Sequence, residues 1–264
     1  MKKMIKALLI IACLIVIGYE AFTIFHSNKQ LIKANALYED IKENALVTTD
    51  AKVEDSYSFD YPKIDIDFKM LEDTNPDFVA WIYIPCLDIS YPVVKEQYIN
   101  EYEHLTFEKE KNVAGCIFTD ILSSDNFAGY HNIIFGHNMK DGSMFGKLKY
   151  IYYDKTIIEN NPYVYIYTKD YVQKCKIFAY YQTTTGSASY DVINNTDDYN
   201  AFLSYIFENS LCKLEPSTDF SDYPSILTLS TCFGKQGSDK RLVIHAYCKD
   251  TCKRKGENYV NWNN

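Results

Sequence analysis

The sequence has 264 residues, of which 47% are hydrophobic and 16% aromatic, with 24 Tyr and only 10 Gly. This length and composition exclude a disordered or repetitive chain and allow a substantial core in one large or two small domains. The net charge of -8 argues against nucleic acid as a partner, because phosphate binding needs a basic face.

The first 25 residues predict a membrane anchor. Three lysines precede an uncharged run from Ala7 to Tyr19. The 22 residues from Met4 to Phe25 are long enough, as a helix, to cross a bilayer core of ~30 Å. Lysines on the N-terminal side put that end in the cytoplasm and the remaining chain outside. A cleaved signal peptide is the alternative, because the strictly uncharged run has only 13 residues, although no clear small-x-small cleavage site follows it.

The next segments predict a helix, a linker and a second helix. Apolar residues recur every three or four positions over Ser27–Ala45, which is typical of an amphipathic helix. Residues 47–63 are polar and break this pattern, and Asp67–Phe78 has room for a short helix. We therefore expect a cytoplasmic tail over 1–6, a transmembrane anchor over 7–25, a juxtamembrane helix and linker over 26–60, a folded domain over 61–252 and a polar tail over 253–264.

From Trp81 onward the chain consists of short β-prone runs bounded by Pro, Gly, Asn or Asp. They are WIYIPCLDISYPVV, VAGCIFTD, HNIIFGHN, PYVYIYTK, KCKIFAYYQTT, SILTLSTC and RLVIHAYC. At least seven strands without alternating helices predict a mainly antiparallel barrel or sandwich. One helix interrupts them around Asp198–Asn209, where Tyr199, Phe202, Leu203, Ile206 and Phe207 form one helical face.

Seven of the eight cysteines lie outside the predicted anchor, an odd number without a tight disulfide spacing. Six of these seven are Cys86, Cys116, Cys175, Cys212, Cys248 and Cys252, and they lie mostly in apolar runs, so we interpret them as buried free thiols. In HAYCKDTC, His245, Cys248 and Cys252 are alternative zinc ligands, but their spacing matches no standard zinc pattern.

The seventh, Cys232, ends the apolar run SILTLSTC, and Arg241 opens the next one. If the loop between them forms a hairpin, these two residues lie near each other at one rim of the sheet. An adjacent guanidinium lowers the pKa of a thiol and stabilises a developing oxyanion. A buried thiol beside a solvent-facing arginine fits the spacing equally, so both interpretations stay open on spacing alone.

A cysteine nucleophile needs a partner for proton transfer. His137 follows the apolar run NIIF and Gly136 and enters a polar loop, and such rim loops commonly display catalytic groups. The other four histidines lie beside the membrane segment, in a polar stretch or at strand-like positions. His137 is therefore the candidate partner, with a purely structural histidine as the alternative.

These motifs together resemble those of the sortases, and most closely the class B sortases. The family's TLxTC motif is similar to TLSTC at Thr228–Cys232, its arginine to the one in KRLVIHA, and its histidine to the one in FGHNMKDGSMFGKL. The resemblance extends over roughly Met70–Ala246. It implies a mainly β fold, a sortase-like closed β-barrel of about eight strands with N-terminal helices and an extra helix before the cysteine strand.

The resemblance also implies an activity, that of a cysteine transpeptidase without a metal or cofactor. Cys232 would attack the Thr carbonyl of a C-terminal sorting motif, NPxTN-like or (S/P)PxTG-like, in surface proteins. A peptidoglycan cross-bridge amine would resolve the thioester. His137 would transfer protons and Arg241 would stabilise the oxyanion, while Ser230 and Thr231 are candidate substrate contacts.

Two alternatives remain, a sortase of another class (housekeeping or pilus-related) and an anchored ectodomain that only binds a wall component. The single-pass membrane location, with the folded domain facing the cell wall, is common to these hypotheses. Phe233 departs from some class B members, which have an acidic residue after the cysteine.

Overall fold

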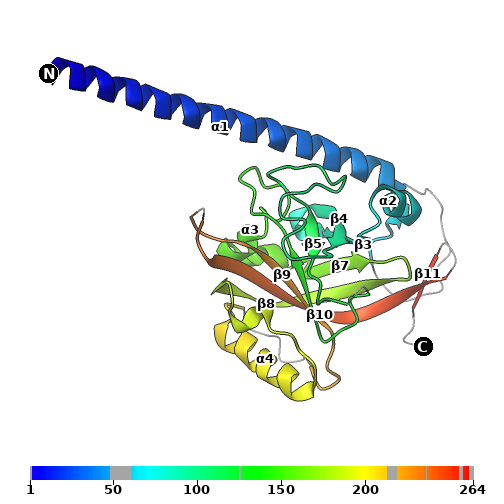
Figure 1. The fold of residues 1–264 in the computed structure, drawn as a ribbon. Coiled ribbons are helices and arrows are strands. Elements are labelled where there is room, and N and C mark those ends of the chain that lie inside the picture. Colours follow the sequence, from blue (N-terminus) through cyan, green and yellow to red (C-terminus); the bar gives the residue numbers. More distant parts are fainter. Residues whose placement is uncertain are drawn as a thin grey trace.

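The computed structural model describes residues 2–47, 61–124, 126–212, 219–235, 237–255 and 258–261. Its centre is a mixed β-barrel (Figure 1). The eight barrel strands are β3 (Phe78–Ile84), β4 (Ile89–Lys95), β5 (Ile117–Thr119), β6 (His131–Phe135), β7 (Tyr163–Tyr167), β8 (Tyr171–Thr184), β9 (Ile226–Cys232) and β10 (Lys240–Lys255).

The strand order β10-β8-β7-β3-β4-β5-β6-β9 closes on itself, because β9 also pairs with β10. Two neighbouring pairs, β4 with β5 and β6 with β9, are parallel, and the others are antiparallel. Closure removes the open sheet edges that an ordinary sheet exposes. The predicted closed barrel of about eight strands is confirmed, and the sandwich alternative is wrong.

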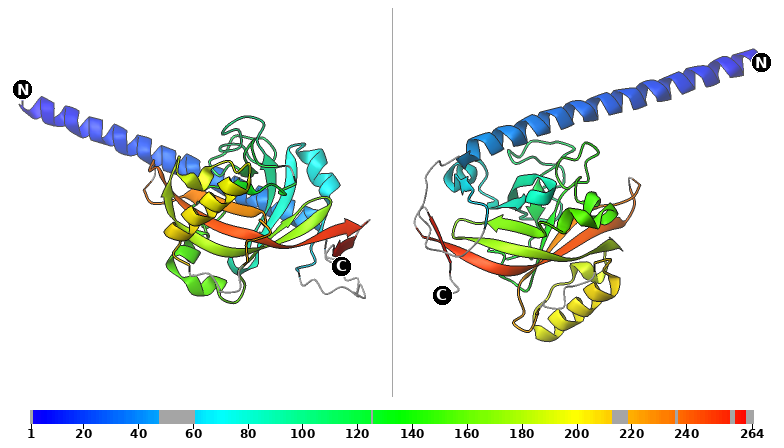
Figure 2. Two further views of the ribbon diagram at one scale, coloured as in Figure 1. Left: turned by 90° about the horizontal axis from the view of Figure 1, so that it is seen from below. Right: turned by 180° about the vertical axis from the view of Figure 1, so that it is seen from behind.

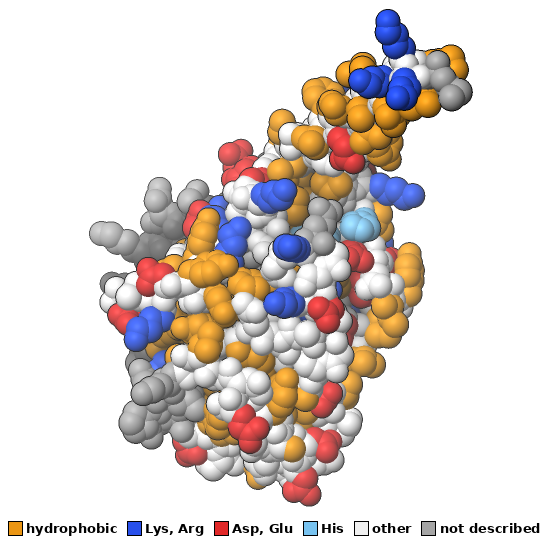
Figure 3. Space-filling model, turned by 90° about the vertical axis from the view of Figure 1, so that its left-hand side faces the viewer, with side chains coloured by type: hydrophobic (Ala, Val, Ile, Leu, Met, Phe, Trp, Pro, Cys, Tyr) orange, Lys and Arg blue, Asp and Glu red, His pale blue; other side chains and the backbone are white. Residues whose placement is uncertain are grey.

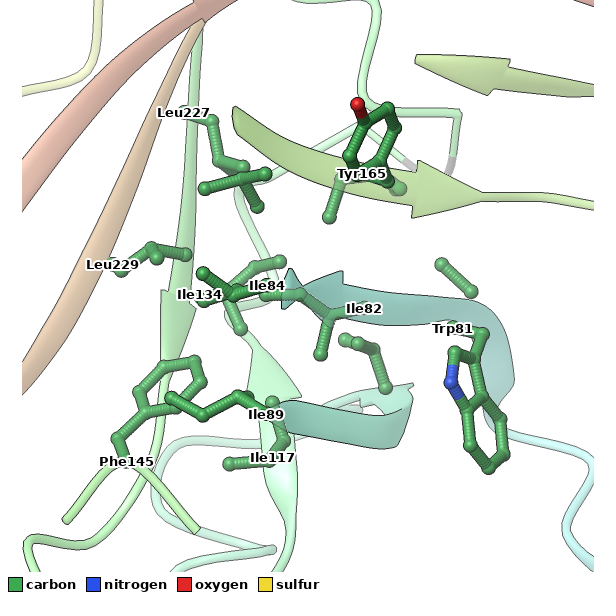
Figure 4. Close-up of a cluster of buried hydrophobic side chains, with 14 of the residues drawn as sticks. Trp81, Ile82, Ile84, Ile89, Ile117, Ile134, Phe145, Tyr165, Leu227 and Leu229 are labelled. Carbon is green, nitrogen blue, oxygen red and sulfur yellow. The ribbon is translucent and has the colours of Figure 1, made fainter. Parts of the chain in front are cut away.

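The barrel interior is filled by large apolar side chains from alternate strand positions (Figure 4). Ile82 and Ile84 of β3 are fully buried, and Leu227 and Leu229 of β9 point into the same cluster. The run WIYIPCLDISYPVV holds parts of two strands, because the 3-10 turn η1 (Pro85–Leu87) reverses the chain with Asp88 in the left-handed conformation.

Helix α1 (Lys2–Ala45) is continuous from the apolar N-terminal segment into the domain (Figures 1 and 2). Its C-terminal part buries Ala34, Tyr38, Ile41 and Ala45 against the barrel. The amphipathic helix predicted over Ser27–Ala45 is therefore present as the C-terminal part of α1. Its N-terminal part extends away from the domain with apolar side chains exposed around it and lysines at the tip (Figure 3).

Several short strands, helices and turns surround the barrel. Strands β1 (Leu46–Val47) and β2 (Asp65–Ile66) form a short ladder, and α2 (Phe68–Thr74) is the predicted short helix, capped by the Asp67 side chain. Helix α3 (Lys149–Tyr153) and the turn η2 (Lys155–Ile158) follow β6. The predicted linker falls mostly on residues 48–60, outside the described residues.

Helix α4 (Thr196–Asn209) is the predicted helix before the cysteine strand, and it lies on the outside of the barrel (Figure 2). The Asn195 side chain caps it by accepting from the Asp197 and Asp198 N–H groups, both at 2.9 Å. Its buried residues are Tyr199, Phe202, Leu203 and Ile206, which pack against Phe178 and Val243 of the barrel. Phe207, predicted on the same face, is 39% exposed.

Strand β10 continues to Lys255, past the predicted domain boundary at residue 252, and pairs with β11 (Asn258–Asn261). Part of the segment predicted as a polar tail is therefore a β-hairpin extension of the barrel sheet.

Candidate active site

Cys232 is the last residue of β9 and the only exposed residue of that strand. The antiparallel register places Arg241 of β10 directly opposite it. The ladder continues by one residue, because the Phe233 N–H donates to the Lys240 carbonyl at 3.0 Å. The hairpin that the spacing allowed is present, and it brings Cys232 and Arg241 together at one rim of the barrel.

The Arg241 guanidinium is fixed by its own hairpin. Its Nη1 donates to the carbonyls of Ser238 at 3.1 Å and Lys240 at 3.0 Å. These bonds restrain the side chain of Arg241, which lines the same cleft as Cys232.

His137 reaches the same rim from the other side of β9. Parallel pairing of β6 with β9 aligns Phe135 with Ser230, and the Gly136 N–H donates to the Ser230 carbonyl at 3.2 Å. The Asn138 side chain then donates to the Cys232 carbonyl at 2.8 Å. His137 is thus held between two hydrogen bonds to the cysteine strand.

Glycine at position 136 is required by packing. A Cβ there would lie 2.5 Å from the Ile117 Cδ1 atom and 2.8 Å from the Phe145 ring. Both neighbours are fully buried, so a side chain would displace the start of the His137 loop.

The His137 ring is oriented by the segment before β5. Its Nε2 lies 2.6 Å from the Glu103 carbonyl, and its ring stacks on His104 with centroids 5.6 Å apart and planes 15° apart. A carbonyl only accepts, so Nε2 carries the proton and Nδ1 is left for proton transfer in the neutral ring. No sequence pattern pointed to Glu103, because this residue contributes only a backbone carbonyl to the contact.

A cleft of about 350 Å³ joins these groups. Part of its wall is a stack of three rings, with Phe118 and Phe135 centroids 5.4 Å apart and Phe135 and Tyr190 6.2 Å apart. Tyr190 belongs to the turn η3 (Ala188–Tyr190), which follows β8. Burial raises the pKa of Tyr190 although Arg241 is near, so its hydroxyl stays neutral at physiological pH.

Ser230 and Thr231 both line the cleft, with their hydroxyls engaged differently. The Ser230 Oγ lies 2.9 Å from the Tyr190 hydroxyl, whereas the Thr231 hydroxyl donates to the Gly136 carbonyl at 2.7 Å. Ser230 is therefore part of the cleft wall beside Tyr190, and Thr231 ties β9 to the loop that carries His137.

Phe233 is 8% exposed and packs on Tyr152 and Tyr153, with ring centroids 5.0 and 6.1 Å away. Its side chain anchors the hairpin loop on the α3 region. This aromatic contact explains why an apolar residue follows Cys232 here.

A buried chain of hydrogen bonds lies behind the cleft wall. It runs from the Asp191 carbonyl through His131, Thr228, His245 and Tyr181 to Ser189, with links of 2.9, 2.7, 2.8, 3.0 and 3.0 Å. The carbonyl accepts from His131 Nδ1, which fixes every later donor: Thr228 donates to His131 Nε2, His245 Nδ1 to Thr228, Tyr181 to His245 Nε2, and Ser189 to Tyr181.

This chain bears on the zinc alternative, because both His245 nitrogens are used by Thr228 and Tyr181. Among the residues that the structure describes, no group of three or more His, Cys, Asp or Glu side chains is arranged to hold a metal ion.

The family model for the Sortase domain matches residues 82–249, which include all the barrel strands except the start of β3 and the end of β10. The chain belongs to the sortase family. Sortases are cysteine transpeptidases, and Cys232, the last residue of TLSTC, is an exposed thiol.

Several similar proteins bear the name sortase B. Sortase B of Listeria monocytogenes is 31% identical over 231 residues, which are 86% of this chain and 87% of the relative. The X-ray structure of Clostridium perfringens sortase B has a TM-score of 0.62 at 30% identity, covering 68% of this chain and 97% of the other. A Staphylococcus aureus sortase B–substrate complex has a TM-score of 0.60 at 28% identity, covering 68% and 83%. The resemblance to class B sortases is confirmed.

The buried histidine chain makes the stability of this sortase depend on pH. Burial lowers the pKa of His131 to about 4, whereas the imidazole of an unfolded chain has a pKa of about 6.5. The unfolded state therefore binds more protons between these values, so stability present above pH 6.5 is lost as the pH falls to about 4. We predict a loss on the order of 3 kcal/mol in the free energy of unfolding for this group.

Urea unfolding of wild type, His131→Gln and His26→Gln at pH 7 and 4.5 measures this effect. His26 is exposed on α1, so its variant should keep the wild-type pH dependence, while His131→Gln should reduce it. An unchanged pH dependence in His131→Gln would contradict the account.

Proposed function

We propose that this sortase is a membrane-anchored cysteine transpeptidase that cleaves a C-terminal sorting motif after Thr and attaches surface proteins to a peptidoglycan cross-bridge amine. The observation that supports this most directly is the arrangement at the rim. An exposed Cys232 lies opposite Arg241 in the β9–β10 register, and hydrogen bonds from both neighbours of His137 reach β9.

In the first half-reaction, the Cys232 thiol gives its proton to His137 Nδ1, and the thiolate attacks the carbonyl carbon of the substrate Thr and forms a C–S bond. The carbonyl electron pair moves to oxygen, and the Arg241 guanidinium stabilises the resulting oxyanion with backbone N–H groups near the cysteine. The C–N bond then breaks, and His137 gives its proton to the leaving amine. The product is a thioester on Cys232.

In the second half-reaction, the cross-bridge amine attacks the thioester carbonyl. His137 takes the proton from the attacking nitrogen, the C–S bond breaks, and Cys232 leaves as the thiolate. The bond to the Glu103 carbonyl occupies Nε2, so Nδ1 carries the proton in both half-reactions.

The cleft fits an extended peptide. The stacked rings of Phe118, Phe135 and Tyr190 give an apolar wall, and the paired hydroxyls of Tyr190 and Ser230 give polar contacts. We assign Ser230 to substrate binding, and Thr231 to positioning the His137 loop through its bond to Gly136. Motifs of the NPxTN-like or (S/P)PxTG-like type are the expected substrates.

Helix α1 is the proposed anchor. It is long and apolar enough to cross a membrane, by length and composition, and its apolar N-terminal side chains are exposed. A signal sequence passes the same test. The lysines at its N-terminus favour a cytoplasmic tail over residues 1–6 and a catalytic domain over 61–252 that faces the cell wall.

A peptide cleavage profile tests the proposed reaction and its specificity together. Wild type should cleave NPxTN-like or (S/P)PxTG-like peptides faster than LPxTG-like ones, and an added amine should divert the product from the hydrolysed to the amide-linked form. Cys232→Ala should lose cleavage and keep the wild-type fold by circular dichroism. Cleavage by this variant would favour a non-catalytic role for Cys232, and a preference for LPxTG-like peptides would favour the housekeeping class.

Arg241 and its neighbour Lys240 provide a matched pair of variants. Because the guanidinium would stabilise the oxyanion, we predict that Arg241→Ala lowers kcat by ~10²–10³. Arg241→Lys should recover only part of the lost kcat, because the lysine ammonium lacks the planar, paired N–H donors of a guanidinium. The exposed Lys240→Ala variant should retain wild-type kcat. An Arg241→Ala rate within a few-fold of wild type would contradict the assignment.

A further inference from the structure

Two cysteines outside the cleft face each other across neighbouring strands. Cys175 of β8 and Cys248 of β10 are direct partners in the antiparallel register. Cys175 is buried, and Cys248 is partly exposed at the edge of the same apolar cluster.

The backbone hydrogen bonds identify the type of pair. The Cys248 N–H donates to Ser225, on the β9 side, at 2.8 Å. The Ile177 N–H donates to Pro162, on the β7 side, at 2.7 Å, and Cys175, two residues away, has the same orientation. Both cysteines therefore direct their backbone bonds away from each other. Such a non-hydrogen-bonded pair has Cα atoms about 4.5 Å apart and close side chains.

The two thiols also contact each other. The interaction with Cys175 lowers the pKa of Cys248, while the same interaction together with burial raises the pKa of Cys175. The Cys248 sulfur also lies 3.4 Å from the Thr251 hydroxyl. Cys248 is thus both the more exposed thiol and the better nucleophile of the pair.

We propose that Cys175 and Cys248 are a redox site that forms a cross-strand disulfide when a small-molecule disulfide, such as oxidised glutathione, reaches the folded domain. The expected Cα separation lies within the range that a disulfide spans. The Cys248 thiolate attacks one sulfur of the small disulfide and releases the first small thiol. Cys175 then attacks the Cys248 sulfur and releases the second, so two protein thiols are oxidised and one disulfide is reduced to two thiols.

The disulfide would tie β8 to β10 around the segment that holds α4, β9, Cys232 and Arg241. It would thereby stabilise the part of the barrel that carries the cleft and leave the Cys232 thiol free. A cross-link that encloses a segment this long restricts the unfolded chain strongly.

The test uses the full-length protein with Cys232→Ala, so that the exposed thiol at the cleft does not interfere. The protein is first reduced and then treated with oxidised glutathione. It is next denatured in the presence of a maleimide, which alkylates the remaining free thiols, and its peptides are mapped by mass spectrometry without reduction. The expected result is a cross-linked peptide pair containing Cys175 and Cys248, with Cys86, Cys116 and Cys252 alkylated. Oxidation should raise Tm on the order of 10 °C.

Matched variants separate this pair from the other thiols. Cys252→Ser, which changes another buried cysteine of β10, should keep the rise in Tm, and Cys175→Ala should lose it. Full alkylation of Cys175 and Cys248 after oxidation, or glutathione that stays on Cys248 without a cross-link, would overturn the proposal. The mapping needs no pair variant, so it decides the question even if Cys175→Ala fails to fold.

Discussion

The pairing of β9 with two different neighbours is the constraint on which both the fold and the site depend. Its antiparallel ladder with β10 closes the barrel and puts Arg241 opposite Cys232. Its parallel ladder with β6 brings in Gly136, and with it His137. The hydrogen bonds that close the barrel are therefore the same ones that assemble the cleft, so the three groups are held by rigid strands and short loops.

A second layer of contacts connects the N-terminal helix to this assembly. Glu103, whose carbonyl orients His137, is followed in the chain by a segment that forms hydrogen bonds with α1. The Tyr38 hydroxyl donates to the Gly115 carbonyl at 2.7 Å, and the Gln30 side chain accepts from the Val113 N–H at 3.0 Å. The helix that we propose as the membrane anchor thus also supports the loop behind the proposed proton carrier.

The sequence was informative wherever local pattern decides structure. Short β-prone runs bounded by turn residues predicted the strands, and the Cys232–Arg241 spacing allowed the hairpin, because both depend on neighbours in the chain. Parallel pairing of β6 with β9 and the Glu103–His137 bond join residues far apart in sequence, and no local pattern encodes them. Tyr190 was missed for a related reason, since only the folded turn distinguishes it among 24 tyrosines.

Detection of the thioester tests the central claim, that Cys232 at the β9 rim is the nucleophile. The full-length protein is mixed with its cleavable peptide without an amine acceptor, quenched in acid and mapped by mass spectrometry. We predict an adduct of the peptide fragment ending in Thr on Cys232, removable by hydroxylamine. Peptide cleavage without an adduct on Cys232, or with the adduct on another cysteine, would contradict the account.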